Sequence, residues 1–167
     1  IEIDGNGNTI EGNINVSSGT TLTLTNVTVD ATNSTDDSYS AVKPTAGSVY
    51  ISDTTIKGQY FAFCQNVGQA AAVTDDINCE VKGSTMDGPI ALYIGHGSWV
   101  FENCHFIGTV TIAGGASVTF KNCTFEAKAE TESYKYETTV GSSGAMFSAN
   151  AIVIIQGRTI SAYESGK

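Results

Sequence analysis

Few residues in this chain have the types and spacing that chemistry requires. His96 stands between two glycines, about twenty residues after the acidic pair Asp75 and Asp76. A histidine and carboxylates are residue types that hydrolases use to move protons. A second acidic pair, Asp36 and Asp37, offers too few oxygens for a hard cation, which needs several converging ligands. The sequence therefore predicts no metal or cofactor site, and the histidine is the only candidate for catalysis.

The rest of the chain is organised as a repeat. The segment SWVFENCHFIG, which begins at Ser98, recurs nineteen residues later as SVTFKNCTFEA. A period near twenty residues is typical of a solenoid, in which each unit buries its apolar face by stacking on the next. Each unit contains two alternating apolar residues, a corner, and a second alternating pair. Each pair predicts a short strand with one buried face.

One column of the repeat predicts the corner between the first two strands. Its residues are Asn, Asp or Gly, which tolerate the left-handed αL conformation that costs other residues about 1–2 kcal/mol. In the order of the coils, the column consists of Asn26, Asp53, Gly83, Asn103, Asn122 and Gly157. A recurring one-residue corner therefore predicts a structural ladder along the chain.

A third strand is predicted in each coil after a small corner residue. We expect Ile90 and Leu92 to point inward in one coil, and Val110 and Ile112 in the next. Three short strands per coil predict an all-β, right-handed parallel β-helix of six to seven coils. We expect one such domain over residues 1–167, as part of a larger chain or assembly.

The asparagine corner resembles the ladder of the pectate-lyase-like superfamily of β-helix proteins. That superfamily includes lyases, hydrolases, phage tailspikes and capsid fibres, and bacterial adhesins, so the resemblance implies a fold and not one activity. The segment Gly95-His96-Gly97 also looks like a motif of polygalacturonase-type hydrolases, in which paired aspartates precede the histidine. The Asn-Thr-Asp and Arg-Ile-Lys segments of that family are absent from this sequence. The alignment of coils instead places His96 in an ordinary turn.

Four cysteines, Cys64, Cys79, Cys104 and Cys123, show neither a CxxC pair nor the Cys/His spacing of a metal site. We interpret them as small buried hydrophobes, since free cysteine is among the most buried residue types. The last two fall in one column of the repeat. Parallel side chains in adjacent coils point side by side, so two free thiols are expected there instead of a disulfide.

Three segments interrupt the period, at residues 32–40, 65–76 and 128–144. The first and third leave before the third strand, so they are predicted to lie on one side of the rod, where partners commonly bind solenoids. The candidate partner-binding residues in them are Asp36, Asp37, Tyr39, Tyr134 and Tyr136. Exposed tyrosines can anchor a protein or a sugar. Tolerated insertions without a partner are the open alternative.

Charge and hydropathy exclude two classes of partner. The formal net charge is −9, and one arginine and seven lysines are scattered along the chain, so no basic stripe for nucleic acid is present. No apolar run reaches the roughly 18 residues that a membrane span requires.

The sequence thus favours a non-enzymatic structural or adhesive module outside the cell, on a virion as a capsid fibre, decoration or tail protein, or on a bacterial surface. We expect a neighbouring protein subunit or domain at the coil ends, with surface carbohydrate and a homo-oligomer as further possibilities. The alternative is a carbohydrate-active enzyme, a polygalacturonase-like hydrolase or a lyase, that uses His96 with Asp75 or Asp76.

Overall fold

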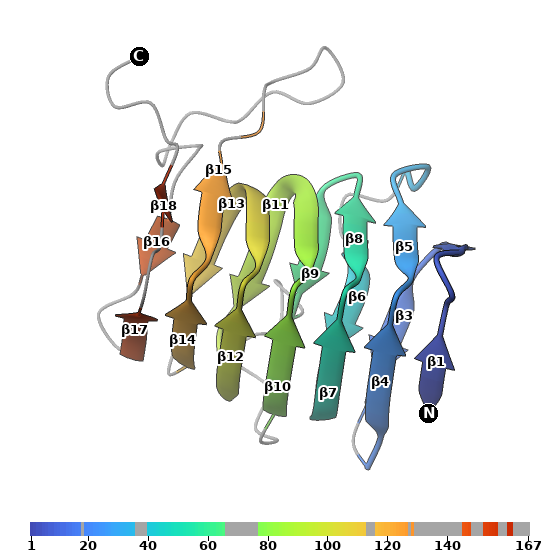
Figure 1. The fold of residues 1–167 in the computed structure, drawn as a ribbon, viewed down its shortest axis with the longest axis horizontal. Helices are drawn as coiled ribbons and strands as arrows, with labels where there is room; N and C mark the ends of the chain where they lie inside the picture. Colours follow the sequence, from blue (N-terminus) through green and yellow to red (C-terminus); the bar gives the residue numbers. More distant parts are fainter. Residues whose placement is uncertain are drawn as a thin grey trace.

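The computed structural model describes residues 1–17, 19–35, 40–65, 77–112, 116–126, 128, 145–147, 152–156 and 160–161. All secondary-structure elements assigned within these ranges are β-strands, and all of them pair in parallel. The chain rises along one ladder of strands, crosses the top of the molecule and returns behind it, with each coil displaced toward the C-terminus (Figure 1). The predicted right-handed parallel β-helix is therefore confirmed.

The first ladder holds the first strand of each coil. Its seven strands are β1 (Glu2–Asp4), β4 (Thr21–Thr25), β7 (Gly47–Ser52), β10 (Ile77–Lys82), β12 (Ser98–Glu102), β14 (Ser117–Lys121) and β17 (Ile152–Gln156). Trp99 pairs with Val118 and Phe101 with Phe120, so the nineteen-residue repeat is one coil, as predicted.

The second ladder follows the corner column. Its strands are β2 (Thr9–Glu11), β5 (Thr28–Ala31), β8 (Thr55–Gly58), β11 (Thr85–Ile94), β13 (His105–Ile112), β15 (Thr124–Glu126) and β18 (Ile160–Ser161). The third ladder contains β3 (Ile14–Val16), β6 (Ser40–Pro44), β9 (Phe61–Cys64) and β16 (Ala145–Phe147). The long strands β11 and β13 continue through the second corner, because their C-terminal halves pair with β9 and β16.

The corner column adopts the conformation that its residue types predict. The φ angles are 49° at Asn26, 49° at Asp53, 57° at Gly83, 55° at Asn103 and 52° at Asn122. Each of these residues donates its backbone N–H to the last residue of the first strand in the next coil, at N···O distances of 2.9–3.1 Å. The corner thus turns the chain and joins successive coils at once. Gly157 lies outside the described residues.

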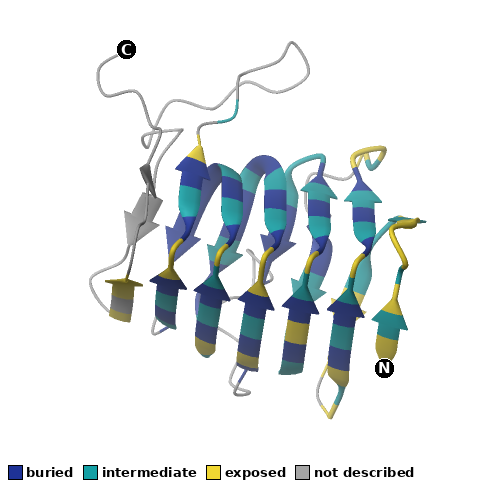
Figure 2. Cartoon of the chain, in the orientation of Figure 1, coloured by how far each residue is buried: buried dark blue, intermediate teal, exposed yellow. Residues whose placement is uncertain are grey.

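The core fills the space between the three ladders. Along β4, β7, β10, β12 and β14 of the first ladder, buried residues alternate with intermediate or exposed ones (Figure 2). Aromatic rings in one column stack from coil to coil, with ring centroids 5.5 Å apart for Phe101 and Phe120 and 5.1 Å for Phe106 and Phe125. These separations follow the spacing of about 4.8 Å between strands, so the backbone ladder sets the packing of the core.

One detail of the predicted register is wrong. In β11 the inward residues are Leu92 and Ile94, which pair with Val110 and Ile112, whereas Ile90 pairs with Thr109. The register of β11 on β13 shifts between Ile90 and Leu92, so β11 has one more residue there than its partner. The register also shifts between Asp87 and Ile90, so Ile90 lies outside the inward row while Leu92 stays in it. An alternating pattern does not reveal such an irregularity.

The corner ladder leads to a prediction about stability. Substituting Asn103→Val should lower the free energy of unfolding by about 1–2 kcal/mol, because a β-branched residue is strained at φ 55°. Asn103→Gly is the matched control, since glycine already occupies this column at Gly83 and adopts αL without strain. Denaturant melts measure the difference, and equal stability of the two variants would contradict the role given to the corner.

Candidate functional site

The predicted catalytic histidine lies in the turn between β11 and β12. The backbone N–H groups of Gly95 and His96 both donate to Gln65 Oε1, at 2.8 and 2.9 Å. The carbonyl of His96 accepts a hydrogen bond of 2.6 Å from Nε1 of the buried Trp99. Gln65 is fully buried, so its amide fixes this turn from within the rod. The backbone of His96 therefore has a structural role at the turn that the sequence predicted.

An open recess of about 620 Å³ lies beside this turn. Its lining residues are Gly47, Ser48, Ile77, Asn78, His96, Gly97 and Ser98. Apart from His96, this lining contains no acidic or basic side chain. Asp75 and Asp76 lie outside the described residues, so the pairing of His96 with a carboxylate stays a prediction.

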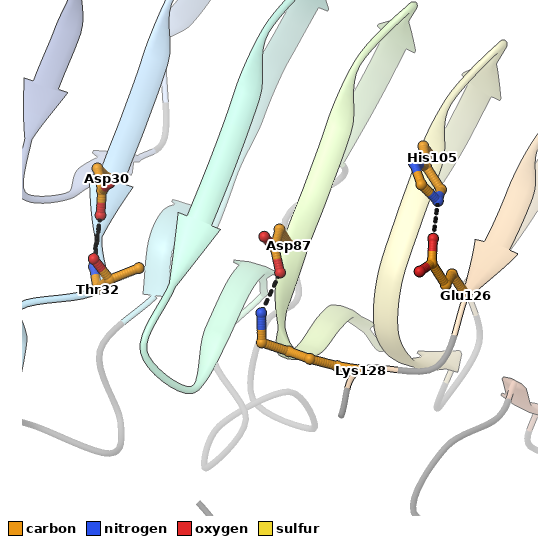
Figure 3. A network of polar contacts seen from close by, with 6 residues as sticks. All are labelled: Asp30, Thr32, Asp87, His105, Glu126 and Lys128. Carbon is orange, nitrogen blue, oxygen red and sulfur yellow. Dashed lines mark hydrogen bonds and ion pairs between the residues drawn. The ribbon is translucent and has the colours of Figure 1, made fainter. Parts of the chain in front are cut away.

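A row of charged side chains follows the outward face of the second ladder (Figure 3). Asp30 Oδ1 accepts hydrogen bonds from the Oγ1 and the backbone N–H of Thr32, at 2.6 and 2.9 Å. These two bonds, the side-chain bond first, lower the pKa of Asp30. Farther along, Lys128 forms an ion pair with Asp87.

The third contact in this row joins His105 and Glu126. Nε2 of His105 lies 3.0 Å from Oε2 of Glu126, and the two side chains are 37% and 50% exposed. The pair comes from adjacent strands, β13 and β15, where the register aligns His105 with Thr124. Each acidic group in this row thus has its own local partner. Within the described part of the chain, no three His, Cys, Asp or Glu residues converge as metal ligands would.

Cys104 and Cys123 occupy a structural column. The residue after each corner points inward, and the column consists of Val27, Thr54, Ser84, Cys104 and Cys123, all at most 3% exposed. The hydroxyls of Thr54 and Ser84 donate to the carbonyl two residues earlier at 2.8 and 2.7 Å, and the two thiols do the same at 3.4 and 3.5 Å. A thiol therefore takes the place of a hydroxyl here, as a weak donor in a buried corner.

All four cysteines are free and buried, as the sequence predicted. The hydrogen bond with the neighbouring Cys123 and then burial raise the pKa of Cys104. Burial likewise raises the pKa of Cys79. Thiols that are buried and held in the protonated form are poor nucleophiles, which favours a packing role for both.

Sequence reasoning missed a group on the outward face of the first ladder. Tyr50 in the middle of β7 is 38% exposed, and it pairs with Thr23 on one side and Glu80 on the other. These residues, with Ile51, Ser52 and Lys82, line a recess of about 150 Å³. The sequence did contain a signal for this surface: Tyr50 is at an outward position between Ser48 and Ser52 of the same strand.

The segments 32–40 and 128–144 both follow a strand of the second ladder and precede one of the third, between β5 and β6 and between β15 and β16. This connectivity agrees with the sequence prediction. The candidate partner-binding residues Asp36, Asp37, Tyr39, Tyr134 and Tyr136 lie outside the described residues, so their role stays a prediction.

No protein-family model, curated protein or solved structure matches this chain. Among the described residues there is also no helix of the length and apolar character needed to cross a membrane. The candidate sites are therefore judged on their own geometry.

The buried amide of Gln65 leads to a second prediction. Gln65→Leu removes the acceptor for two N–H groups and should destabilise the protein by about 1–3 kcal/mol for each group left buried without a partner. Amide exchange at Gly95 and His96 should accelerate more than exchange in β14, which reports the global loss of stability and serves as the control. Unchanged exchange at both amides would show that Gln65 does not hold the turn.

Proposed function

We propose that this chain is a non-enzymatic structural or adhesive β-helix module displayed on a virion or a bacterial surface. The observation that supports it is the dispersal of the described polar side chains. The ion pairs Asp87–Lys128 and His105–Glu126 involve strands of the second ladder, and Glu102–Lys121 lies on the first ladder. Catalysis by proton transfer needs an acid and a base aimed at one reacting atom, and separate pairs on two ladders do not provide that arrangement.

The C-terminal end of the described rod supports the proposal that a partner covers it. At the C-terminal end, Ile152, Ile154 and Ile155 of β17 are 60%, 45% and 55% exposed (Figure 2). Ile155 pairs with Phe120, which is an inward position, so its exposure marks the open interior of the last described coil. Exposed apolar side chains on the last described strand of a ladder are typical of a surface that another chain covers. We assign this place to a neighbouring subunit or domain.

The finer assignment, to the non-catalytic members of the pectate-lyase-like superfamily, belongs to the same proposal. It is supported by the left-handed corner that recurs in register at Asn26, Asn103 and Asn122. Phage capsid fibres, decorations and tail proteins come first among those members, and bacterial adhesins second. All of these roles use a rod as a spacer that presents side chains away from a larger body.

The location of the protein tests the proposal. Antibodies raised against the full chain should, in immunogold microscopy of the producing culture, label virions or the outer surface of cells. Detergent-permeabilised cells are the control for antibody access to the interior. Gold particles confined to the cell interior would overturn the proposal.

A carbohydrate-active enzyme is the second candidate, and one observation favours it. His96 lines the recess of about 620 Å³, which is large enough for a sugar ring. We expect no release of reducing ends or unsaturated products when the wild-type chain is incubated with polygalacturonate and a panel of neutral polysaccharides. Release that is lost in His96→Ala, with the stability of the variant unchanged, would establish the enzyme instead.

A further inference from the structure

The outward face of the first ladder differs in charge from the molecule as a whole. On the five strands β4, β7, β10, β12 and β14, the charged outward residues are two acids and two lysines, Glu80, Glu102, Lys82 and Lys121, while the chain carries a net charge of −9. Most of the other outward positions on these strands are Ser, Thr or Asn. Glu102 and Lys121 form an ion pair with an N···O distance of 3.0 Å. The face is therefore close to neutral and rich in small hydrogen-bonding groups.

Tyr50 is the aromatic residue of this face. Its neighbours across the ladder are the hydroxyl of Thr23 and the carboxylate of Glu80, and Lys82 lies two residues along the strand from Glu80. All four residues line the recess of about 150 Å³. An aromatic ring supplies a flat apolar surface, a carboxylate accepts hydrogen bonds and an ammonium group donates them. A pyranose ring, with C–H groups on its faces and hydroxyls at its edge, is complementary to this set.

A second recess continues the first one on the same two strands. Ser48 and Asn78, which line the recess beside the His96 turn, precede Tyr50 and Glu80 by two residues and pair with each other. Two residues along a strand correspond to about 7 Å, and the distance from Ser48 to Ser52 is about 13 Å. The hollowed area over β7 and β10 thus has the length of an oligosaccharide.

Other classes of ligand suit this surface less well. β7 and β10 are interior strands with a neighbour on both sides, so a peptide has no free strand edge to extend. The net charge of the chain and the carboxylate of Glu80 repel polyanions such as nucleic acid and acidic glycans. A neutral sugar experiences no such repulsion.

We propose that the surface formed by Ser48, Tyr50, Asn78, Glu80 and Lys82 binds a neutral oligosaccharide. Tyr50 stacks on one pyranose ring, and Glu80 and Lys82 form hydrogen bonds with its hydroxyls. The recess beside His96 receives the next sugar unit. This inference rests on the proposed adhesive role, for which it names the class of ligand.

Calorimetric titration of the full chain with defined trisaccharides tests the inference. The neutral probes are maltotriose, cellotriose, mannotriose and galactotriose, and trigalacturonate is the acidic counterpart. At least one neutral probe should bind, and Tyr50→Ala should weaken its affinity at least about fivefold. Tyr50→Phe should retain most of the affinity, because the ring is kept, and Glu80→Gln should weaken binding. Tyr93→Ala is the control: it removes a tyrosine from the third ladder's side of the rod and should leave the affinity for the trisaccharide unchanged.

Two outcomes would overturn the inference: no binding of any neutral probe, or binding that Tyr50→Ala leaves intact. Tighter binding of trigalacturonate would contradict the neutral class of ligand. Tyr50 is exposed, so its variants should fold, and an unchanged circular dichroism spectrum checks this. If no sugar binds but immunogold labels the surface, only this inference fails. If a sugar binds but the label stays inside cells, the proposed display fails.

Discussion

The backbone hydrogen bond at the corner column is the interaction on which the rest of the structure depends. A residue such as Asn103 takes the left-handed conformation and donates its N–H to the carbonyl of Lys121 in the next coil, at 2.9 Å. Without that conformation the chain would not change direction at this residue. Without the hydrogen bond, the corner would leave a polar group unpaired at each coil. Turning and stacking are thus one event, repeated along the rod.

Side-chain packing follows from this repeat. The ladder fixes the distance between coils. Aromatic residues at the same position in adjacent coils, such as Phe106 and Phe125, therefore lie at the spacing of stacked rings. The corner also makes a narrow buried position that accepts Val, Thr, Ser or Cys, provided that any polar atom donates to the carbonyl two residues earlier. This position explains Cys104 and Cys123, whose thiols make that hydrogen bond.

The sequence predicted the architecture well, because the architecture depends on local rules. An Asn, Asp or Gly corner and an alternating apolar pattern determine the first two strands of a coil, and the predicted nineteen-residue repeat pairs Trp99 with Val118. The sequence did not predict the bulge near Ala91, because the bulge depends on how two neighbouring coils fit together. The sequence did not predict the surface around Tyr50 for a related reason. Its residues come from β4, β7 and β10, and only the register of these strands shows that they are close together.

The shared corner from which segments 32–40 and 128–144 depart has a geometric consequence. Their anchoring strands, β5 and β15, are separated by four steps of the second ladder, which place the two departure points about 19 Å apart along the axis. Insertions or deletions that preserve the fold can change that separation only by whole coils. The rod therefore fixes the axial separation of these two points in multiples of the spacing between coils.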